Sequence, residues 1–345
     1  MMNAVRKTVI VRELGELVRC NAFEPGTPPL FIEPASDALK ERERFLQWAK
    51  ECRPTLDALI CEYGGIVLRG FPISETAHFA ALMALFPTFH GDYKGGVAPR
   101  MRVEGQVMEA TRLDRAVRLR LHSEMAYLRD YPLRIAFFSK KAADIGGETI
   151  IGDVRGLLES LPQPLRKKLE EHGIMTVRNY APRTAALDAA VPHMDLRGWN
   201  LAFETDDPAE VEEVCRSKGL EPLWNEDGGL TVINRTGAAA AHPKTGQLLY
   251  RSNLHSYNTV TVSEGLDAEL VESIRASQKH PTGTFLGNGE PLTLEDVQHF
   301  EHFLDQRTRA WPWLDGDVMI LDNLETWHGR NPYQGSRDVQ VAMLD

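Results

Sequence analysis

The chain has 345 residues, of which 43% are hydrophobic and 26% are charged, a composition typical of a globular protein with one large or two ordinary domains. Its 39 basic and 49 acidic residues give a net charge of −10, which argues against binding to nucleic acid or to an anionic membrane. We expect no membrane span and no signal peptide, because no apolar run is long enough. The four cysteines, which lack CxxC spacing, favour a cytoplasmic protein with reduced thiols: Cys20, Cys52, Cys61 and Cys215.

The first 90 or so residues are predicted to mix strands and helices. Short strands are expected at 9–11 and 66–71. A helix is expected from Ser36 to about Cys61, with a break or kink at Pro54, because proline lacks the amide hydrogen that a helix interior needs. A second helix is expected to begin at Ser74 and to end near residue 85.

The remainder is predicted as strands interleaved with helices. Strands are expected at 117–121, 133–139, 228–234, 247–262, 317–321 and 337–344, and residues 146–153 are expected to form a turn followed by a strand. Helices are expected at 154–160, 163–172, 207–218, 266–278 and 293–309, and two of them begin with recognisable caps, Asp207-Pro208 and Thr293-x-x-Asp296. No repeat or long linker divides the chain. We therefore expect a single domain over 1–345, with an N-terminal region of about 1–90 packed on a core of strands.

A histidine and a glutamate follow the predicted strand at 117–121. Its apolar residues alternate with arginines, and the same period of two places His122 and Glu124 together on the other face. An imidazole and a carboxylate side by side supply two thirds of a 2-His-1-carboxylate site for Fe(II). The spacing alone is not specific, because it recurs without a strand pattern at three other histidines: His90, His193 and His299.

The C-terminal stretch supplies a second histidine and a candidate anion site. His328 and Arg337 flank a predicted turn at 331–336, so they should lie on successive strands. Arg337 has the same parity as Val339 and Val341, on the apolar face of the last strand. An arginine aimed toward a core needs an anionic partner, because an unpaired buried charge costs several kcal/mol. A bound dicarboxylate, held by both prongs of the guanidinium, would satisfy it.

Taken one by one, these residues also fit ordinary structural roles. His328 beside a tryptophan could be a hydrogen-bonded core histidine. Arg330 shares its strand face and could form a structural salt bridge, support the metal ligands or contact substrate. The pair Gly146-Gly147 could be only a turn, and Thr149 only a β-branched strand residue. The joint order and spacing of the motifs decides between these interpretations.

The motif order His122-x-Glu124, Gly146-Gly147-Glu148-Thr149 and His328-Gly-Arg330…Arg337 resembles the TauD/TfdA family of Fe(II)- and 2-oxoglutarate-dependent dioxygenases. The similarity extends from about residue 63 to residue 343. It is greatest to the branch that hydroxylates amino acids in specialised-metabolite pathways, such as the syringomycin-pathway aspartyl hydroxylase. That branch shares glutamate at position 124, Met125-x-Tyr127 and Gly-Arg-Asn-Pro-Tyr after the distal histidine.

The resemblance implies an α+β fold with a mainly β core, a double-stranded β-helix (jelly roll) with flanking helices. It makes His122, Glu124 and His328 the iron ligands, and it makes Thr149 and Arg337 the residues that bind the distal carboxylate of 2-oxoglutarate. It implies that oxidative decarboxylation of 2-oxoglutarate by O₂ to succinate and CO₂ is coupled to hydroxylation. Desaturation, epoxidation and cyclisation stay open as alternative outcomes.

The substrate implied by the resemblance is an amino acid or an amino-acid-derived small molecule from natural-product biosynthesis. Candidate residues for contacting it, or for supporting the metal ligands, are Tyr127, Arg251, Asn253 and Arg330. Relatives have an aromatic residue where Arg251 stands, so Arg251 is a candidate clamp for a substrate carboxylate or for the phosphate of a carrier-protein arm.

The acidic net charge favours a free small substrate over one tethered to a carrier protein, since carriers are usually acidic too. A local basic patch could override this repulsion: Arg112, Arg115, Arg118 and Arg120. Two functions of other classes are weighed against the dioxygenase. A zinc hydrolase could use the same three ligands but would leave Arg337 unexplained, and a non-catalytic small-molecule binding protein would have no need of the intact triad.

Overall fold

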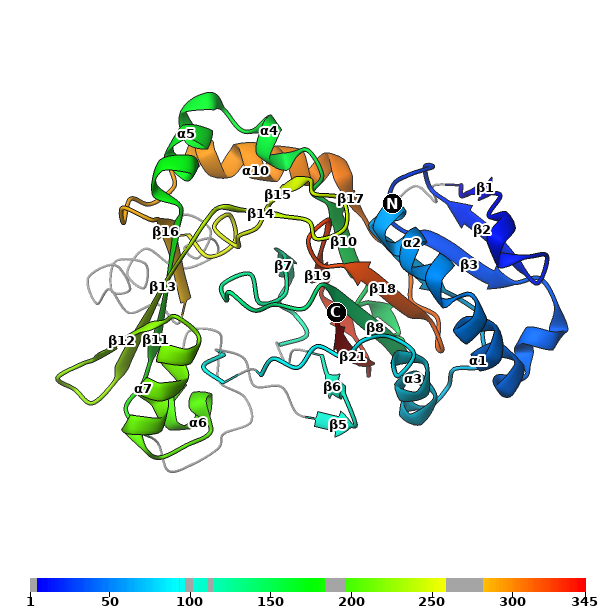
Figure 1. Ribbon diagram of the computed structural model, residues 1–345, viewed down its shortest axis with the longest axis horizontal. Helices are drawn as coiled ribbons and strands as arrows, with labels where there is room; N and C mark the ends of the chain where they lie inside the picture. The colour runs from blue at the N-terminus through cyan, green and yellow to red at the C-terminus, as the bar shows by residue number, and fades with distance from the viewer. Residues whose placement is uncertain (1–4, 93, 97–101, 111–113, 184–196, 259–281) are drawn as a thin grey trace.

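The computed structural model describes residues 5–92, 94–96, 102–110, 114–183, 197–258 and 282–345, and it has a sheet-rich core flanked by helices (Figure 1). The predicted helix at 266–278, the end of the predicted strand at 247–262, Arg112 and His193 lie outside these residues. The described helices are η1 (Arg12–Leu14), η2 (Asp37–Lys40), α1 (Arg42–Glu51), α2 (Arg53–Tyr63), α3 (Thr76–Met83), α4 (Leu157–Ser160), α5 (Gln163–His172), α6 (Trp199–Phe203), α7 (Pro208–Ser217) and α10 (Leu294–Arg307).

A nine-stranded sheet forms the centre of the molecule. In spatial order it contains β1 (Lys7–Val9), β2 (Val18–Ala22), β3 (Leu30–Pro34), β4 (Gly65–Leu68), β18 (Val318–Asp322), β8 (Arg134–Lys141), β21 (Asp338–Leu344), β6 (Val107–Glu109) and β5 (Arg102–Glu104). The central strands are apolar along most of their length because both faces of the sheet are covered. On β18, Val318 and Ile320 belong to the same hydrophobic core as buried residues of α1, α2 and α3. Met319 and Leu321 point the other way, toward a second sheet.

The second sheet holds the histidines. Its order is β17 (Thr308–Arg309), β10 (Thr149–Asp153), β19 (Thr326–Arg330) and β7 (Leu119–His122). β7 and β19 run antiparallel with His122 directly opposite His328, and a register shift follows. Gly329 permits this close pairing, since a Cβ there would lie 2.5 Å from the carbonyl oxygen of Leu119. The pairing therefore fixes two imidazoles side by side.

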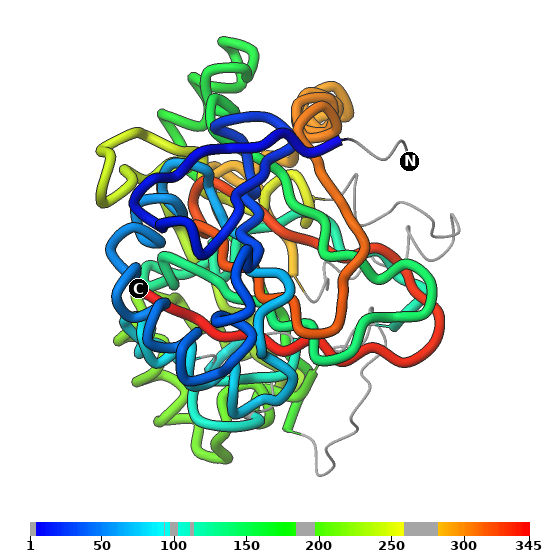
Figure 2. Tube along the Cα trace, turned by 90° about the vertical axis from the view of Figure 1, so that its right-hand side faces the viewer, coloured from blue at the N-terminus to red at the C-terminus, as the bar shows by residue number. Residues whose placement is uncertain are grey.

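A third sheet stands at the end of the molecule opposite the N-terminal region. It contains β12 (Glu221–Trp224), β13 (Leu230–Thr236), β11 (Ile174–Tyr180) and β16 (Thr282–Leu286), with α7 beside it (Figure 1). Figure 2 shows the molecule from the other end, with β1–β3, α1 and α2 in blue toward the viewer. Two small ribbons complete the described strands: β14 (Ala239–Ala241) with β15 (Leu248–Tyr250), and β9 (Ile145–Gly146) with β20 (Tyr333–Gln334).

Most predicted elements are confirmed, and the differences have local causes. The helix expected from Ser36 to Cys61 is divided at Cys52 into α1 and α2, with Pro54 in the first turn of α2, where its missing amide hydrogen costs nothing. α10 begins with the expected capping box of Thr293 and Asp296. β11, β12 and β16 were not predicted. In the described part of the chain, no helix is both long enough and apolar enough to cross a membrane.

The strand predicted at 117–121 was placed two residues too early. β7 covers Leu119–His122, and Val117 lies in the preceding turn. Glu124 lies beyond the strand, in a turn whose next residue, Met125, has a left-handed φ of 55°. Alternation along a strand therefore does not bring Glu124 to His122, and the turn must do so instead.

Candidate metal centre

Three side chains converge where β7 and β19 meet the turn that follows β7. The potential ligand atoms of His122, Glu124 and His328 all lie within 4.8 Å of one another, so the three side chains could hold a single metal ion. The rings of His122 and His328 are 4.4 Å apart, and His328 Nε2 lies 3.7 Å from a carboxylate oxygen of Glu124. Two imidazoles and a carboxylate in this arrangement are the donor set of a facial Fe(II) site.

A backbone carbonyl orients the His122 ring. Its Nδ1 lies 2.9 Å from the carbonyl oxygen of Arg120. A carbonyl only accepts hydrogen bonds, so Nδ1 carries the hydrogen and Nε2 keeps its lone pair. The tautomer suited to metal binding is therefore fixed by the same strand that carries the ligand.

Two asparagines hold the turn that carries Glu124. The fully buried Asn323 accepts a hydrogen bond from the amide of Glu124 (2.8 Å) and donates to its carbonyl (3.0 Å) and to the carbonyl of Pro132 (2.8 Å). Asn253 makes the same two-sided contact with the backbone of Ser123, at 3.2 and 3.3 Å. The turn is thus pinned on both sides, which compensates for Glu124 lying outside the strand.

A second cluster of metal-binding side chains has no free histidine nitrogen to offer. Cys61, His242 and Glu325 also bring ligand atoms within 4.8 Å of one another. The His242 Nε2 donates to Asp322 at 2.9 Å, and its Nδ1 accepts from the amides of residues 244 and 245. Both nitrogens are engaged, so we assign the iron to the other group.

A small cavity adjoins the histidines on the side of the last strand. It is lined by Ala110, Leu119, His122, Phe137, Thr149, His328, Gly329, Arg330, Arg337, Val339 and Val341. The Nε of Arg337 donates to the carbonyl of Gly147 at 2.9 Å. Burial, together with the neighbouring charge of Arg330, lowers the pKa of Arg337 to about 10. The Thr149 hydroxyl accepts from the Trp313 indole at 3.2 Å, which leaves its hydrogen for a ligand in the cavity. The cavity thus offers cationic and hydroxyl donors to an anion.

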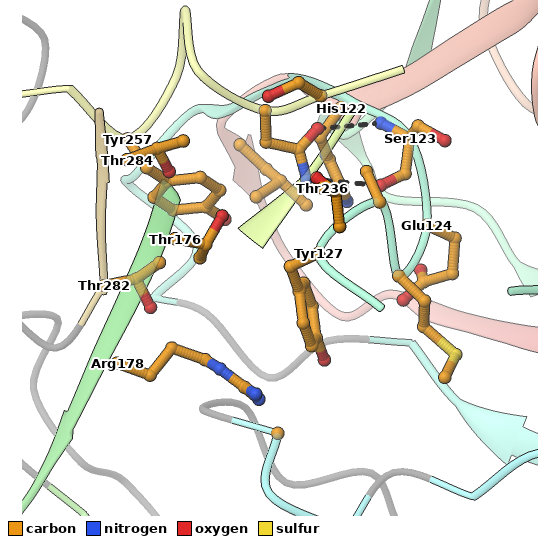
Figure 3. A pocket seen from close by; sticks show the side chains of 16 residues that line it. His122, Ser123, Glu124, Tyr127, Thr176, Arg178, Thr236, Tyr257, Thr282 and Thr284 are labelled. Atoms are coloured by element: carbon orange, nitrogen blue, oxygen red, sulfur yellow. Dashed lines mark hydrogen bonds between the residues drawn. The ribbon is translucent and has the colours of Figure 1, made fainter. Parts of the chain in front are cut away.

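A larger cavity opens on the Glu124 side of the histidines (Figure 3). Its lining residues are Gly96, Leu119, His122, Ser123, Glu124, Met125, Ala126, Tyr127, Thr176, Arg178, Thr236, Ser252, Asn253, Tyr257, Thr282 and Thr284. His122 lines both cavities, so a metal bound to it would lie between them. One metal at this position would therefore be reached from two separate cavities.

The four residues predicted to contact substrate or to support the metal ligands occupy different positions. Tyr127 and Asn253 line the larger cavity. The side-chain oxygen and nitrogen of Asn253 are both hydrogen-bonded to the backbone of Ser123. Arg330 lines the smaller cavity, and its guanidinium donates to the carbonyls of Asp114 and Val117 at 2.7 and 2.9 Å.

Arg251 lies outside the lining of both cavities. It donates to the carbonyls of Met125 and Leu128 and stacks on the Tyr131 ring at 3.6 Å. Arg251 therefore supports the metal-binding turn from behind, and the expectation that it clamps a substrate group does not fit its position.

The sequence interpretation missed Asn323 and Arg178. Asn323 follows the predicted strand at 317–321, where an asparagine gives no pattern beyond that of a turn. Arg178 did leave a signal: it has the parity of Ile174 and Tyr180, so it is an arginine on the buried face of a strand. That is the argument that identified Arg337, and it would have found Arg178 had β11 been recognised.

Replacing Asn323 tests its role as a support for Glu124. We expect Asn323→Ala to weaken Fe(II) binding by about 10- to 100-fold, as losses around metal ligands commonly do. It should also lower the free energy of unfolding by about 1–3 kcal/mol, because buried backbone groups lose their partners. Anaerobic competition with a chelating dye and urea unfolding measure the two effects. Asn288→Ala, at an exposed turn, is the control, and equal Fe(II) affinity in both variants would contradict the assignment.

Glu325 makes stability depend on pH. Burial, with the nearby charge of Asp322, raises the pKa of its carboxyl from 4.5 to about 7. Between these values the folded protein binds more protons than the unfolded chain, so the free energy of unfolding falls as pH rises from 4.5 to 7. The loss should be on the order of 3 kcal/mol.

Glu325→Gln should remove this part of the pH dependence, because an amide does not ionise. Urea unfolding at pH 5 and pH 8 measures it, with Glu226→Gln at an exposed site as the control. The raised pKa of His242 acts in the same direction, and its largest cause, the hydrogen bond to Asp322, is common to both variants. A wild-type slope in Glu325→Gln would show that Glu325 is not the group responsible.

Comparison with known proteins agrees with this geometry. The family model for "Taurine catabolism dioxygenase TauD, TfdA family" matches residues 33–343. Dapdiamide synthesis protein DdaC of Enterobacter agglomerans is 28% identical over 293 residues, 84% of each chain. A clavaminate synthase-like protein of Arabidopsis thaliana is 28% identical over 329 residues, 93% of this chain and 94% of that protein.

A solved structure shares the fold. It is that of PvcB, an Fe, alpha-ketoglutarate dependent oxygenase from an isonitrile synthetic pathway, with a TM-score of 0.51 at 13% identity, covering 96% of this chain and 92% of that one. The matched residues include all three candidate ligands, the whole β17-β10-β19-β7 sheet and the last strand as far as Met343. The chain therefore belongs to the TauD/TfdA family of Fe(II)- and 2-oxoglutarate-dependent dioxygenases.

Proposed function

We propose that this enzyme hydroxylates an amino acid or an amino-acid-derived small molecule, with Fe(II) held by His122, Glu124 and His328 and with 2-oxoglutarate anchored by Arg337 and Thr149. The observation that carries the assignment is the position of Arg337. Its guanidinium lines a small cavity next to the two histidines, and its one hydrogen bond within the described structure goes to a backbone carbonyl.

The residues present fit both groups. Neutral imidazoles and a carboxylate suit Fe(II), and hydrogen bonding already fixes the His122 tautomer. The distal carboxylate of 2-oxoglutarate would receive two parallel hydrogen bonds from Arg337 and one from the Thr149 hydroxyl. Val339 and Val341 form apolar walls beside it, which strengthens the ion pair by excluding water.

Iron and 2-oxoglutarate, when bound, supply the oxidation by O₂ that yields succinate, CO₂ and a hydroxylated substrate. The contribution of the chain is placement. Asn323 and Asn253 hold the turn of Glu124, and the β7–β19 pairing holds the histidines. Substrate would enter the larger cavity, which His122 and Glu124 line directly. Desaturation, epoxidation and cyclisation are other outcomes that the same placement allows.

The fold that best suits this arrangement is a double-stranded β-helix, with the nine-stranded and the β17-β10-β19-β7 sheets as its two faces. We also propose that 1–345 forms a single domain. β4, from the N-terminal region of about 1–90, pairs with β18 inside the main sheet, which supports that proposal.

We propose a free small molecule as substrate, in a pathway of natural-product synthesis. The 28% identical relative DdaC is named for dapdiamide synthesis, which supports that setting. For a carrier protein the basic patch offers little, because Arg120 is paired with Glu301 at 2.9 Å. We place the reaction in the cytoplasm, where the four free cysteines and Fe(II) would stay reduced.

Anaerobic titration of the protein with Fe(II) and then 2-oxoglutarate tests the cofactor assignment. Chelation of the iron should produce a weak visible charge-transfer band. His122→Ala and His328→Ala should each abolish the band while leaving the fold intact. The control is His299→Ala, an exposed histidine of α10 with the same His-x-acid spacing.

Two results would count against the proposal. A well-folded wild-type protein without the band would favour the zinc hydrolase or the non-catalytic binding protein. A band in either ligand variant equal to that of wild type would remove that histidine from the site.

Arg337 should govern the affinity for 2-oxoglutarate. Arg337→Ala leaves a buried carboxylate without its partner, a loss of about 3–5 kcal/mol, or roughly two to four decades in the dissociation constant. Arg337→Lys should recover only part of this, because an ammonium cannot make the two-pronged contact. Titration of the visible band measures each constant. Lys140→Ala, which removes a surface cation 3.9 Å from Asp338, is the control, and a change under about threefold in Arg337→Ala would refute the role.

A further inference from the structure

A buried arginine lies in the wall of the substrate cavity with part of its hydrogen-bonding capacity unused. Arg178 is on β11 and is 1% exposed. Its Nη1 donates to the carbonyl of Gly95, whereas Nε and Nη2 are buried and have no hydrogen-bond partner in the structure described. Figure 3 shows the side chain extending into the cavity below Tyr127. In arginine–carboxylate pairs, Nε and Nη2 are the two nitrogens on one edge of the guanidinium that can donate two parallel hydrogen bonds to a carboxylate.

The described residues compensate only weakly for the charge of Arg178. The Tyr127 ring lies 4.5 Å from the guanidinium carbon, which is a weak cation–π contact. Such a contact does not replace the ionic partner that a buried charge needs. No carboxylate among the described residues pairs with Arg178. An anion from solution would supply the ionic partner that the described residues do not provide.

The strand opposite Arg178 offers a second unused group. Thr282 on β16 is directly paired with Arg178, and its buried hydroxyl has no hydrogen-bond partner in the described structure. Thr176 and Thr284 form the next pair along the same two strands, and both line the cavity. A carboxylate at Arg178 would therefore also lie beside neutral hydroxyls that can donate to it.

Apart from Glu124, the described lining residues include no group that could balance a substrate ammonium group. Of the lining residues that the structure describes, Glu124 alone is acidic, and its carboxylate is a metal ligand in the proposed site. An ammonium group in this cavity would be desolvated near the positive charge of Arg178 and would lack an anion of its own. An acylated nitrogen, in contrast, needs only the hydrogen bonds that hydroxyl groups supply.

We propose that Arg178 is the substrate anchor and that the substrate is an N-acylated amino acid or a similar carboxylate without a free ammonium group. This inference rests on the proposed function, because it takes the cavity beside Glu124 as the substrate site. It narrows the substrate from amino-acid-derived molecules in general to those carrying one negative charge and a neutral nitrogen.

Binding to the anaerobic Fe(II)- and 2-oxoglutarate-loaded protein tests this without relying on turnover. The probes are the N-acetyl-L-amino acids, the matching free amino acids and the matching N-acetyl amino-acid amides, with dissociation constants from calorimetry. At least one N-acetyl amino acid should bind. Its free amino acid and its amide should each bind at least about 30-fold more weakly, because one lacks a partner for its ammonium and the other lacks the carboxylate.

Three variants separate anchoring from structural support. Arg178→Gln should weaken binding of the best N-acetyl amino acid by about 30-fold or more, and Arg178→Lys should retain part of the affinity. Both should keep the visible band of the iron–2-oxoglutarate complex, which reports that the metal centre is intact. Arg235→Gln, an exposed arginine on the neighbouring strand β13 that pairs with Glu221, is the matched control and should bind like wild type.

Each other outcome overturns a defined part of the proposal. Unchanged affinity in Arg178→Gln removes the anchor, and a free amino acid that binds as well as its N-acetyl form removes the requirement for a neutral nitrogen. If no N-acetyl amino acid binds at millimolar concentration to a protein that shows the visible band, the substrate class is wrong and the cofactor assignment stands. If wild type shows no band, the proposed function itself fails.

Discussion

The backbone pairing of β7 with β19 is the constraint on which the metal centre depends. Antiparallel pairing sets His122 opposite His328, so two ligands are fixed by main-chain hydrogen bonds before any metal is considered. Gly329 allows the strands to approach, and the Arg120 carbonyl selects the His122 tautomer. The third ligand is the less constrained one. Glu124 is held by side chains, and its position is only as firm as the contacts of Asn323 and Asn253.

The two cavities beside the histidines resemble each other in charge, because an arginine lines each of them. Each contains an arginine with little compensation from the described residues, the half-buried Arg337 on one side of the histidines and the buried Arg178 on the other. An arginine in such a position is a cost to folding that an anionic ligand removes. Two separate anion sites around one metal suit two anionic ligands that must be present together.

The sequence was sufficient to predict the three candidate metal ligands and insufficient to predict the lining of the larger cavity, and the reason is physical. His122, His328 and Arg337 lie on strands with clear alternation or beside a recognisable turn, so local patterns predict them. Glu124 was assigned correctly to the group but for the wrong reason, because β7 ends at His122 and Glu124 lies in the turn that follows. Arg178 and Asn323 matter through contacts with residues more than 80 positions away, and such contacts leave little trace in a local pattern.

The location of Arg178 has a consequence for how such an enzyme can change. β11 and β16 belong to a sheet separate from the strands that carry the histidines. Substitutions on that sheet can alter charge and shape around the ligand while the main-chain register of the iron strands stays the same. In the proposed enzyme, the histidines that bind iron and the arginine that binds substrate therefore belong to different sheets. New substrate specificities can arise, or be engineered, by changing residues of the β12-β13-β11-β16 sheet and leaving the β17-β10-β19-β7 sheet intact.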